Sequence, residues 1–123
     1  MGERKMKIIR NKELSIQDRP DGRTVTRILQ QETGMKFSSF QMLYVTHPPN
    51  LREGLHAHEI SYEALYFLDQ ANYIVNGEHY QLNERDLLLL EPGDVHGAIP
   101  IGREVRILVF QIPAITDDKK VRE

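Results

Sequence analysis

The chain has 123 residues, of which 40% are hydrophobic and 28% charged, and its net charge is -2 at pH 7. These values are ordinary for one soluble globular domain, and they give no electrostatic reason for binding nucleic acid. The absence of cysteine excludes disulfides and thiolate chemistry, so any metal must be bound by nitrogen and oxygen atoms. We expect no signal peptide, and no apolar run in the sequence approaches the length of a membrane span. We therefore expect a single cytoplasmic domain over residues 1–123, with no membrane contact.

Short strands separated by turn residues are predicted along most of the chain. An N-terminal strand region covers about residues 1–22, and a charged tail over about 116–123 is expected to be frayed. Because no helical period extends beyond two turns, the sequence predicts an all-β protein, an antiparallel barrel or sandwich. Asn76-Gly77 is the clearest hairpin turn. Besides the segment with the two histidines described next, the expected strands are 7–10, 24–29, 37–46, 64–68, 72–75, 78–82, 87–90 and 105–112.

A group of potential metal ligands lies near the middle of the chain. His56 and His58 are two residues apart, so in a strand both side chains point to the same face. Glu63 shares that face if the chain turns through residues 60–61 and then resumes as a strand. Two histidines and one carboxylate with open positions form the ligand set of non-haem iron sites. His96, after the turn signal at 92–94, is a fourth candidate.

Two of these residues could have roles other than metal binding. Glu63 could be a salt-bridge partner at the mouth of a barrel, and His96 could form a hydrogen bond with a loop carbonyl. If the four side chains meet, they would bind one divalent transition metal ion, and iron, manganese, nickel, zinc and copper are all chemically acceptable. His47 precedes two prolines and is expected in a surface loop, and His79 is expected to be exposed.

The order of these motifs resembles the two conserved motifs of the cupin superfamily. The resemblance implies a double-stranded β-helix, or jelly-roll barrel, with one divalent metal held inside it. The residues that carry the resemblance are His56, His58 and Glu63, then Asn76 and Gly77 at the hairpin, then Gly93 and His96. It implies that the two histidines, the glutamate and the later histidine are the ligands. It covers about residues 40–112 and does not specify a reaction, because fold does not determine function.

Some turn positions depart from the family pattern, and they leave the subfamily open. These positions are Gln70, Arg85, Glu91 and Pro100. The pattern from residue 62 to 96 is also similar to the sugar-sensing barrel of arabinose-regulator-type transcription factors. Those proteins carry a helix-turn-helix region downstream, which is not found in this sequence, so DNA binding is not expected.

The surroundings of the site are predicted from strand parity. A pocket for a small organic molecule is expected to be lined by Met42, Tyr44, Phe67 and Phe110. Tyr66 has the opposite parity from Glu63 and should project outward, on an apolar face that must be covered. A second copy of the chain, with N-terminal strands pairing across a two-fold axis, is the simplest cover, so we expect a homodimer.

Three functions remain open from the sequence. The first is a metalloenzyme that acts on a small organic substrate such as a sugar derivative, an oxo-acid or a phenol. The second is a metal- or ligand-binding module without turnover, and the third is a structural barrel that has lost the metal. The sequence offers no general acid or base near the metal beyond Tyr44 and Glu63, so it assigns no catalytic residue.

Overall fold

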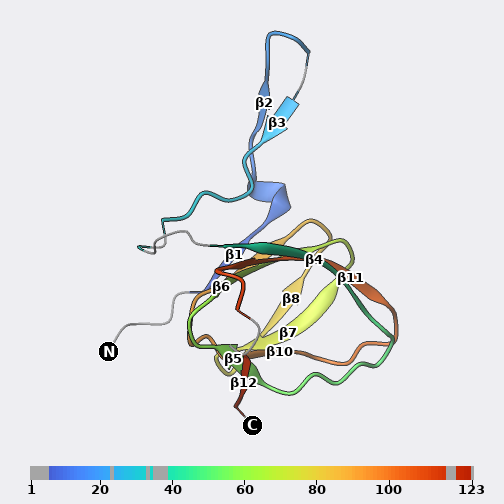
Figure 1. Ribbon diagram of the computed structural model, residues 1–123. Coiled ribbons are helices and arrows are strands. Elements are labelled where there is room, and N and C mark those ends of the chain that lie inside the picture. Colours follow the sequence, from blue (N-terminus) through green and yellow to red (C-terminus); the bar gives the residue numbers. More distant parts are fainter. Residues whose placement is uncertain (1–5, 23, 33, 35–38, 116–118, 123) are drawn as a thin grey trace.

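The structure is a computed structural model that describes residues 6–22, 24–32, 34, 39–115 and 119–122 (Figure 1). Within these residues the chain forms strands and one short 3-10 helix, η1 (Asn11–Glu13). No helix in this described part is long and apolar enough to cross a membrane. The strands are β1 (Lys7–Ile9), β2 (Ile16–Asp18), β3 (Thr24–Thr26), β4 (Gln41–His47), β5 (His56–His58), β6 (Tyr62–Phe67), β7 (Ala71–Val75), β8 (Glu78–Leu82), β9 (Leu87–Leu90), β10 (His96–Ala98), β11 (Val105–Ile112) and β12 (Lys119–Val121).

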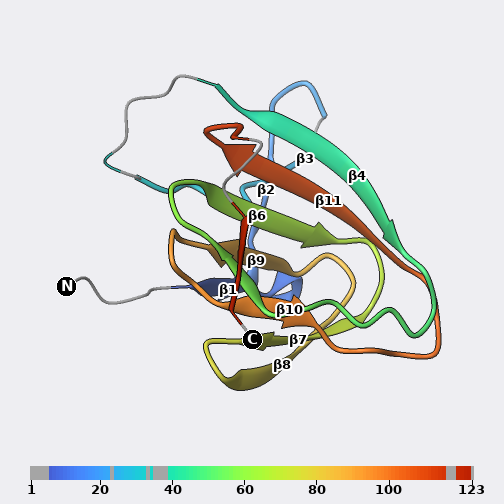
Figure 2. The same ribbon diagram turned by 60° about the horizontal axis from the view of Figure 1, so that its bottom comes forward.

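Two five-stranded antiparallel sheets form the barrel. The first sheet has the strand order β1-β9-β6-β11-β4, and the second has the order β12-β5-β10-β7-β8. Figure 2 shows β4, β11 and β6 side by side in the first sheet, with β10 and β7 of the second sheet below them. Strands β2 and β3 pair only with each other, and this hairpin projects away from the barrel (Figure 1). The predicted all-β fold, a double-stranded β-helix, is confirmed.

Alternating side chains fill the space between the two sheets. On β11, Val105, Ile107 and Val109 are buried, while the residues between them are less buried or exposed. Phe67 on β6 and Tyr73 on β7 meet edge to face, with ring centroids 5.4 Å apart. A period of two along each strand therefore separates the inner face of each sheet from its outer face.

The four leucines of β9 are buried on both faces of their sheet. Leu88 and Leu90 belong to the core between the sheets, whereas Leu87 and Leu89 join a second cluster on the outer face. Ile28 and Leu29, which follow β3 along the chain, pack against that second cluster. An uninterrupted apolar strand is expected where both faces of a sheet are covered.

Two turns next to β8 use left-handed backbone conformations. Asn76 and Gly77 have φ angles of 49° and 84° and join β7 to β8, as the Asn-Gly signal predicts. Arg85 has a φ of 69°, in a region that favours glycine. At this position the family pattern has glycine, so the departure at Arg85 places a larger residue in the same backbone conformation.

Several strand boundaries differ from the prediction. β3 ends at Thr26 rather than residue 29, and β4 begins at Gln41, although residues 37 and 38 of the expected strand lie outside the described residues. β2 was not predicted. The expected frayed tail contains β12, which pairs with β5, while residues 116–118 and 123 lie outside the described residues. Pairing with an existing strand supplies backbone hydrogen bonds that the charged composition of the tail does not indicate.

The N-terminal strand region is anchored to the barrel by Asp86. Its carboxylate accepts hydrogen bonds from Arg10 Nη1 at 2.6 Å, from the Asn11 backbone at 3.1 Å and from the Asn83 backbone at 2.8 Å. Only 3% of Asp86 is exposed. This one side chain therefore connects the start of the chain to the turn between β8 and β9.

Candidate metal centre

The three central histidines come from two neighbouring strands of the second sheet. His56 and His58 are the first and last residues of β5, so both side chains point into the barrel. His96 begins β10 and is the direct register partner of His56. Gly97, the next residue, lies close to the segment that precedes β5. A Cβ added at this position would be 3.1 Å from the Glu53 carbonyl oxygen. The short strand and the glycine together bring His96 against β5.

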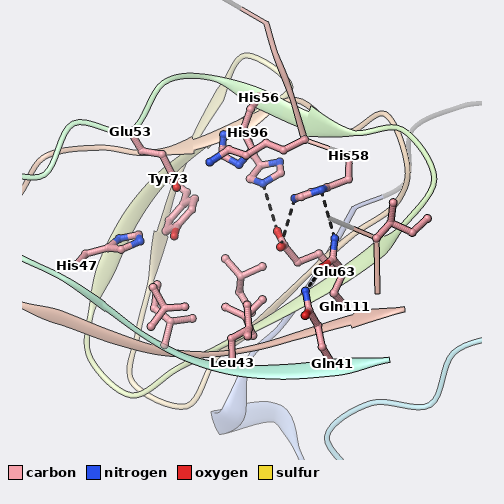
Figure 3. A pocket seen from close by; sticks show the side chains of 16 residues that line it. Gln41, Leu43, His47, Glu53, His56, His58, Glu63, Tyr73, His96 and Gln111 are labelled. Carbon is pink, nitrogen blue, oxygen red and sulfur yellow. Dashed lines mark hydrogen bonds and ion pairs between the residues drawn. The ribbon is translucent and has the colours of Figure 1, made fainter. Parts of the chain in front are cut away.

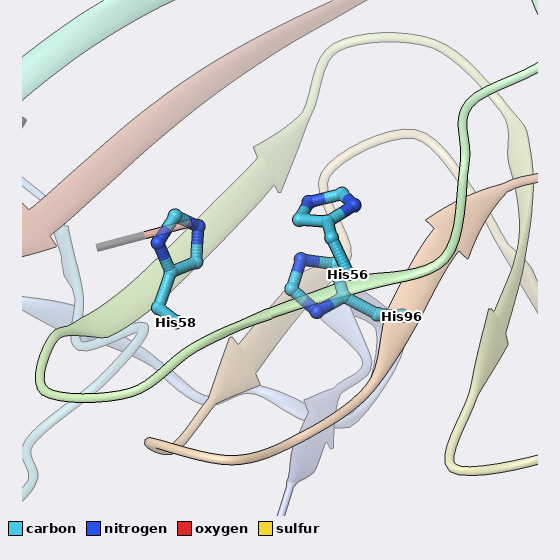
Figure 4. A group of neighbouring side chains, drawn as sticks. All are labelled: His56, His58 and His96. Carbon is cyan, nitrogen blue, oxygen red and sulfur yellow. The ribbon is translucent and has the colours of Figure 1, made fainter. Parts of the chain in front are cut away.

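The histidine side chains meet at one end of a cavity between the sheets (Figures 3 and 4). One nitrogen atom from each of His56, His58 and His96 lies within 4.8 Å of the other two. The ring centroids of His56 and His96 are 4.3 Å apart, and that of His58 lies about 6 Å from both. The cavity has a volume of about 370 Å³. These nitrogen atoms are close enough to bind one metal ion together.

Glu63 reaches the same point from β6 in the opposite sheet. Its Oε2 lies 3.3 Å from Nε2 of His58, and its Oε1 lies 3.4 Å from Nε2 of His96. Burial raises the pKa of the carboxyl, but hydrogen bonds and charge interactions with the two histidines outweigh it and lower the pKa to about 2. The structure thus brings the four predicted ligand residues together, with an ionised carboxylate among them at neutral pH.

Hydrogen bonds to backbone carbonyls fix the orientation of two of the rings. Nδ1 of His56 donates to the Gly54 carbonyl at 2.8 Å, and Nδ1 of His96 donates to the Asp94 carbonyl at 3.0 Å. With the proton on Nδ1, Nε2 keeps its lone pair for a metal. Burial lowers the pKa of His56, so this ring favours the neutral form, which is the form that binds metals.

A pair of amides holds the third ring. Gln41 donates to the side-chain oxygen of Gln111, whose amide nitrogen lies 3.5 Å from Nδ1 of His58. If both amides turn by 180°, the Gln111 oxygen faces Nδ1 instead, and the hydrogen bonds run the other way. That arrangement places the proton of His58 on Nδ1 and leaves Nε2 free to bind a metal.

The substitution Gln111→Leu is expected to lower metal affinity about 10–100-fold, as loss of a partner that orients a metal ligand usually does. Leucine keeps the volume of the side chain but cannot hydrogen-bond to His58. Competition with a chromophoric chelator measures the change. The matched control is Gln81→Leu on the exposed side of β8, which should leave the affinity within twofold. Equal affinities for the Gln111 variant and the control would show that Gln111 does not position His58.

Solved structures with similar folds are available for comparison, although the chain matches no protein-family model and no curated protein sequence. A conserved Klebsiella pneumoniae protein with a double-stranded β-helix domain is 22% identical, with a TM-score of 0.59 over 72% of this chain and 79% of that chain. A cupin protein from Bacteroides fragilis is 16% identical, with a TM-score of 0.56 over 70% and 80%. The protein has the cupin fold. Pac13 from Streptomyces, a nucleoside dehydratase, is also similar, at 16% identity and a TM-score of 0.59 over 94% and 89%.

The pocket of this cupin barrel is lined by different side chains from those expected. On β4 the inner face carries Gln41, Leu43, Val45 and His47, so Met42 and Tyr44 lie on the outer face, 59% and 61% exposed. The expectation that these two line the pocket was wrong, because both sets of alternating residues on β4 contain apolar side chains and sequence parity could not choose between them.

The two predicted pocket phenylalanines also lie elsewhere. Phe67 is on the inner face but is completely buried in the core, where it packs against Tyr73 instead of lining the cavity. Phe110 packs in the cluster on the outer face of the first sheet. The prediction that Phe110 lines the pocket was wrong. Phe110 is the register partner of Met42 on the neighbouring strand, so both side chains lie on the outer face.

A second polar group lines another side of the cavity. Figure 3 shows His47, Glu53 and Tyr73 on the side of the pocket opposite Gln41 and Gln111. The expectation of a surface loop for His47 was wrong, because His47 is the last residue of β4 and its side chain lines the pocket. Only the parity of β4 could have indicated this from the sequence.

Tyr73 and Glu53 bring a hydroxyl group and a carboxylate to the cavity. Burial, with a smaller contribution from Glu53 and Glu63, raises the pKa of Tyr73 well above its usual value, so its hydroxyl keeps its proton at neutral pH. Glu53 Oε1 accepts a hydrogen bond from the Ala98 backbone at 3.0 Å, which fixes the carboxylate beside β10. The pocket therefore contains a hydrogen-bond donor and a carboxylate in addition to the histidine cluster.

Proposed function

We propose that this cupin barrel binds one divalent transition metal ion and uses it to bind and polarise a small organic molecule. The observation that carries the proposal is the convergence of His56, His58 and His96, with one nitrogen from each within 4.8 Å of the others. In the proposal, Glu63 is the fourth ligand. Imidazole nitrogens with one carboxylate favour iron, manganese, nickel, zinc or copper over magnesium or calcium. When bound, the ion supplies Lewis-acid chemistry at the pocket wall.

The size and lining of the pocket support a small oxygen-containing ligand. A volume of about 370 Å³ is at the lower end of the range for small-molecule sites. Apolar side chains from β4, β6 and β11 of the first sheet provide much of the remaining surface, and Gln41 and Gln111 offer amide groups next to His58. A compact molecule with a carbonyl or hydroxyl oxygen on one end and an apolar body fits this arrangement.

The polar residues away from the histidines favour catalysis over binding alone. An enzyme of this kind needs a group that gives or takes a proton while the ion holds the substrate. His47 and Glu53 line the same cavity and are candidates for this role, while Tyr73 donates a hydrogen bond. A binding module without turnover is the second candidate, in which the same groups would hydrogen-bond to the ligand. The cytoplasmic location remains a prediction.

Metal content and an open coordination position test the proposal together. Protein purified without an affinity tag is expected to contain, or to take up, about one transition metal ion per chain. The cobalt(II)-loaded protein should then change its visible absorption when azide is added, because a pocket-facing position is open to small ligands. A chain that binds none of the five metals would overturn the proposal. A bound cobalt ion whose spectrum ignores azide would make the site structural.

A further inference from the structure

The C-terminal strand adds a lysine to the wall of the cavity. β12 lies beside β5 (Figure 1), and in their antiparallel register Lys119 is the direct partner of His58. Directly opposed residues of an antiparallel pair project from the same face of the sheet. The Lys119 side chain therefore extends on the face that carries His56 and His58. It is one of the residues that line the cavity, whereas its neighbour Lys120 is not.

Two further contacts hold β12 in this register. The Arg122 backbone nitrogen donates to the Leu55 carbonyl at 2.7 Å, just before β5 begins. The Arg122 guanidinium forms an ion pair with Glu59 at 3.1 Å, just after β5 ends. A shift of one residue would turn every side chain of a strand to the other face. The fixed register therefore decides that Lys119, and not Lys120, faces the cavity.

The ammonium group of Lys119 is available to a ligand. It forms no ion pair with a carboxylate in the described part of the chain. Burial is the main cause of the lowered pKa of His56, and the charge of Lys119 is a smaller one, so the ammonium group lies within electrostatic range of the histidines. Among the described residues that line the cavity, Lys119 is the only lysine or arginine. The wall of the site thus presents one unpaired positive charge.

The charges of the metal-loaded site favour a ligand with one negative charge. Glu53 and Glu63 are the carboxylates among the described lining residues, and the histidines bind a metal in their neutral form. With the Lys119 ammonium, the wall carries one net negative charge, which a divalent ion changes to one net positive charge. A singly negative ligand balances this charge, whereas a neutral ligand leaves it uncompensated. Complementary charge is what selects one ligand over another of the same shape.

We propose that the small molecule bound by this site is a monocarboxylate with a hydroxyl or carbonyl oxygen on a neighbouring carbon, and that Lys119 binds its carboxylate. The inference rests on the metal binding proposed above, because the ion is the partner of the other oxygen. Lys119 and His58 are opposed in register, so the two oxygen-containing groups of the molecule are close together. The 2-hydroxy acids and 2-oxo acids have this arrangement. Leu43 and Ile115 of the cavity wall are available to an apolar remainder.

Titration of the cobalt(II)-loaded protein with lactate and lactamide tests the charge of the ligand. The two molecules have nearly the same size, but only lactate is negatively charged. Visible absorption should report an affinity for lactate at least about tenfold higher than for lactamide, the usual contribution of a hydrogen bond between charged groups. Lys119→Met should remove this preference by weakening lactate binding alone. Lys119→Arg keeps the positive charge and should keep the preference. Because Lys119 is exposed, neither substitution disturbs the core.

Lys120→Met is the matched control, because Lys120 is also exposed but does not line the cavity, and it should leave lactate affinity unchanged. Competition with a chelator measures metal affinity separately. Lys119→Met should bind cobalt at least as tightly as the unmodified chain, since it removes a positive charge near the ligands. A cobalt spectrum that ignores lactate, equal affinities for lactate and lactamide, or equal lactate affinities for the two methionine variants would overturn this inference and leave the metal site standing. A chain that binds no metal would overturn the proposed function, and this inference with it.

Discussion

The substitution His96→Ala is expected to lower metal affinity by more than about a hundredfold, because even partners outside the ligand set contribute 10–100-fold. His96 is 2% exposed and its ring centroid lies 4.3 Å from that of His56. Its backbone hydrogen bond to Asp94 fixes the nitrogen that faces the cluster. Alanine removes that nitrogen and leaves two histidines from a single strand. Competition with a chelator at fixed pH measures the loss.

Two further variants define the ligand set. His79→Ala removes a histidine that is exposed on β8, and it should leave metal affinity unchanged within twofold. Glu63→Gln keeps the size of the side chain but removes its charge. If Glu63 is the fourth ligand, this variant should bind the metal more weakly than the unmodified chain. If His96→Ala binds metal as tightly as His79→Ala, the three histidines are not the site. If only Glu63→Gln has no effect, the ligand set consists of histidines alone.

Part of the convergence of the candidate ligands could be predicted because it depends on local geometry. The two-residue spacing of His56 and His58 fixes a common face in any strand, whereas Glu63 lies on β6 of the opposite sheet and faces them across the barrel instead of sharing their face. The contribution of His96 depended on pairing between β10 and β5, residues far apart in the chain. Here the family resemblance supplied what spacing alone could not, and the structure places the side chain accordingly.

The pocket was harder to predict because it contradicts the usual rule that apolar residues lie inside. On β4 the aromatic Tyr44 lies outside, while the polar Gln41 lies inside and donates to Gln111. A functional cavity requires polar groups in the interior. Placing the more apolar set of alternating β4 residues inside the barrel therefore selects the wrong face. His47 was assigned to a surface loop because two prolines follow it, and nothing in its immediate neighbourhood indicates a partner across the barrel.

The β2–β3 hairpin and the C-terminal tail show a different limit of predicting strands from sequence. β2 and β12 each have three residues, and all six are exposed, so neither has an alternating pattern that a sequence can reveal. β12 forms because β5 offers a free edge, and β2 forms because β3 follows a turn. Strands of this kind depend on their pairing partners and not on their own hydrophobic period.

The substitution Asp86→Ala is expected to lower the free energy of unfolding by about 3–5 kcal/mol, the usual result of breaking a buried ion pair. The Asp86 carboxylate accepts three hydrogen bonds, one of them from Arg10, and is almost completely buried. Alanine leaves the Asn11 and Asn83 backbone groups without this acceptor and releases the N-terminal strand region from the barrel. A fall in melting temperature of at least about 10 °C should accompany the loss.

Asp69 provides a matched control with the same number of hydrogen bonds. Its carboxylate accepts bonds from Arg106 N, Nε and Nη2, each at 2.9 Å, but its side chain is 27% exposed against 4% for Asp86. Because water replaces these bonds readily, Asp69→Ala should cost less than about 1 kcal/mol. Urea unfolding of metal-free protein at one protein concentration compares the two, since association would otherwise shift the midpoint. Equal losses would attribute the stabilisation to the hydrogen bonds themselves rather than to the burial of Asp86.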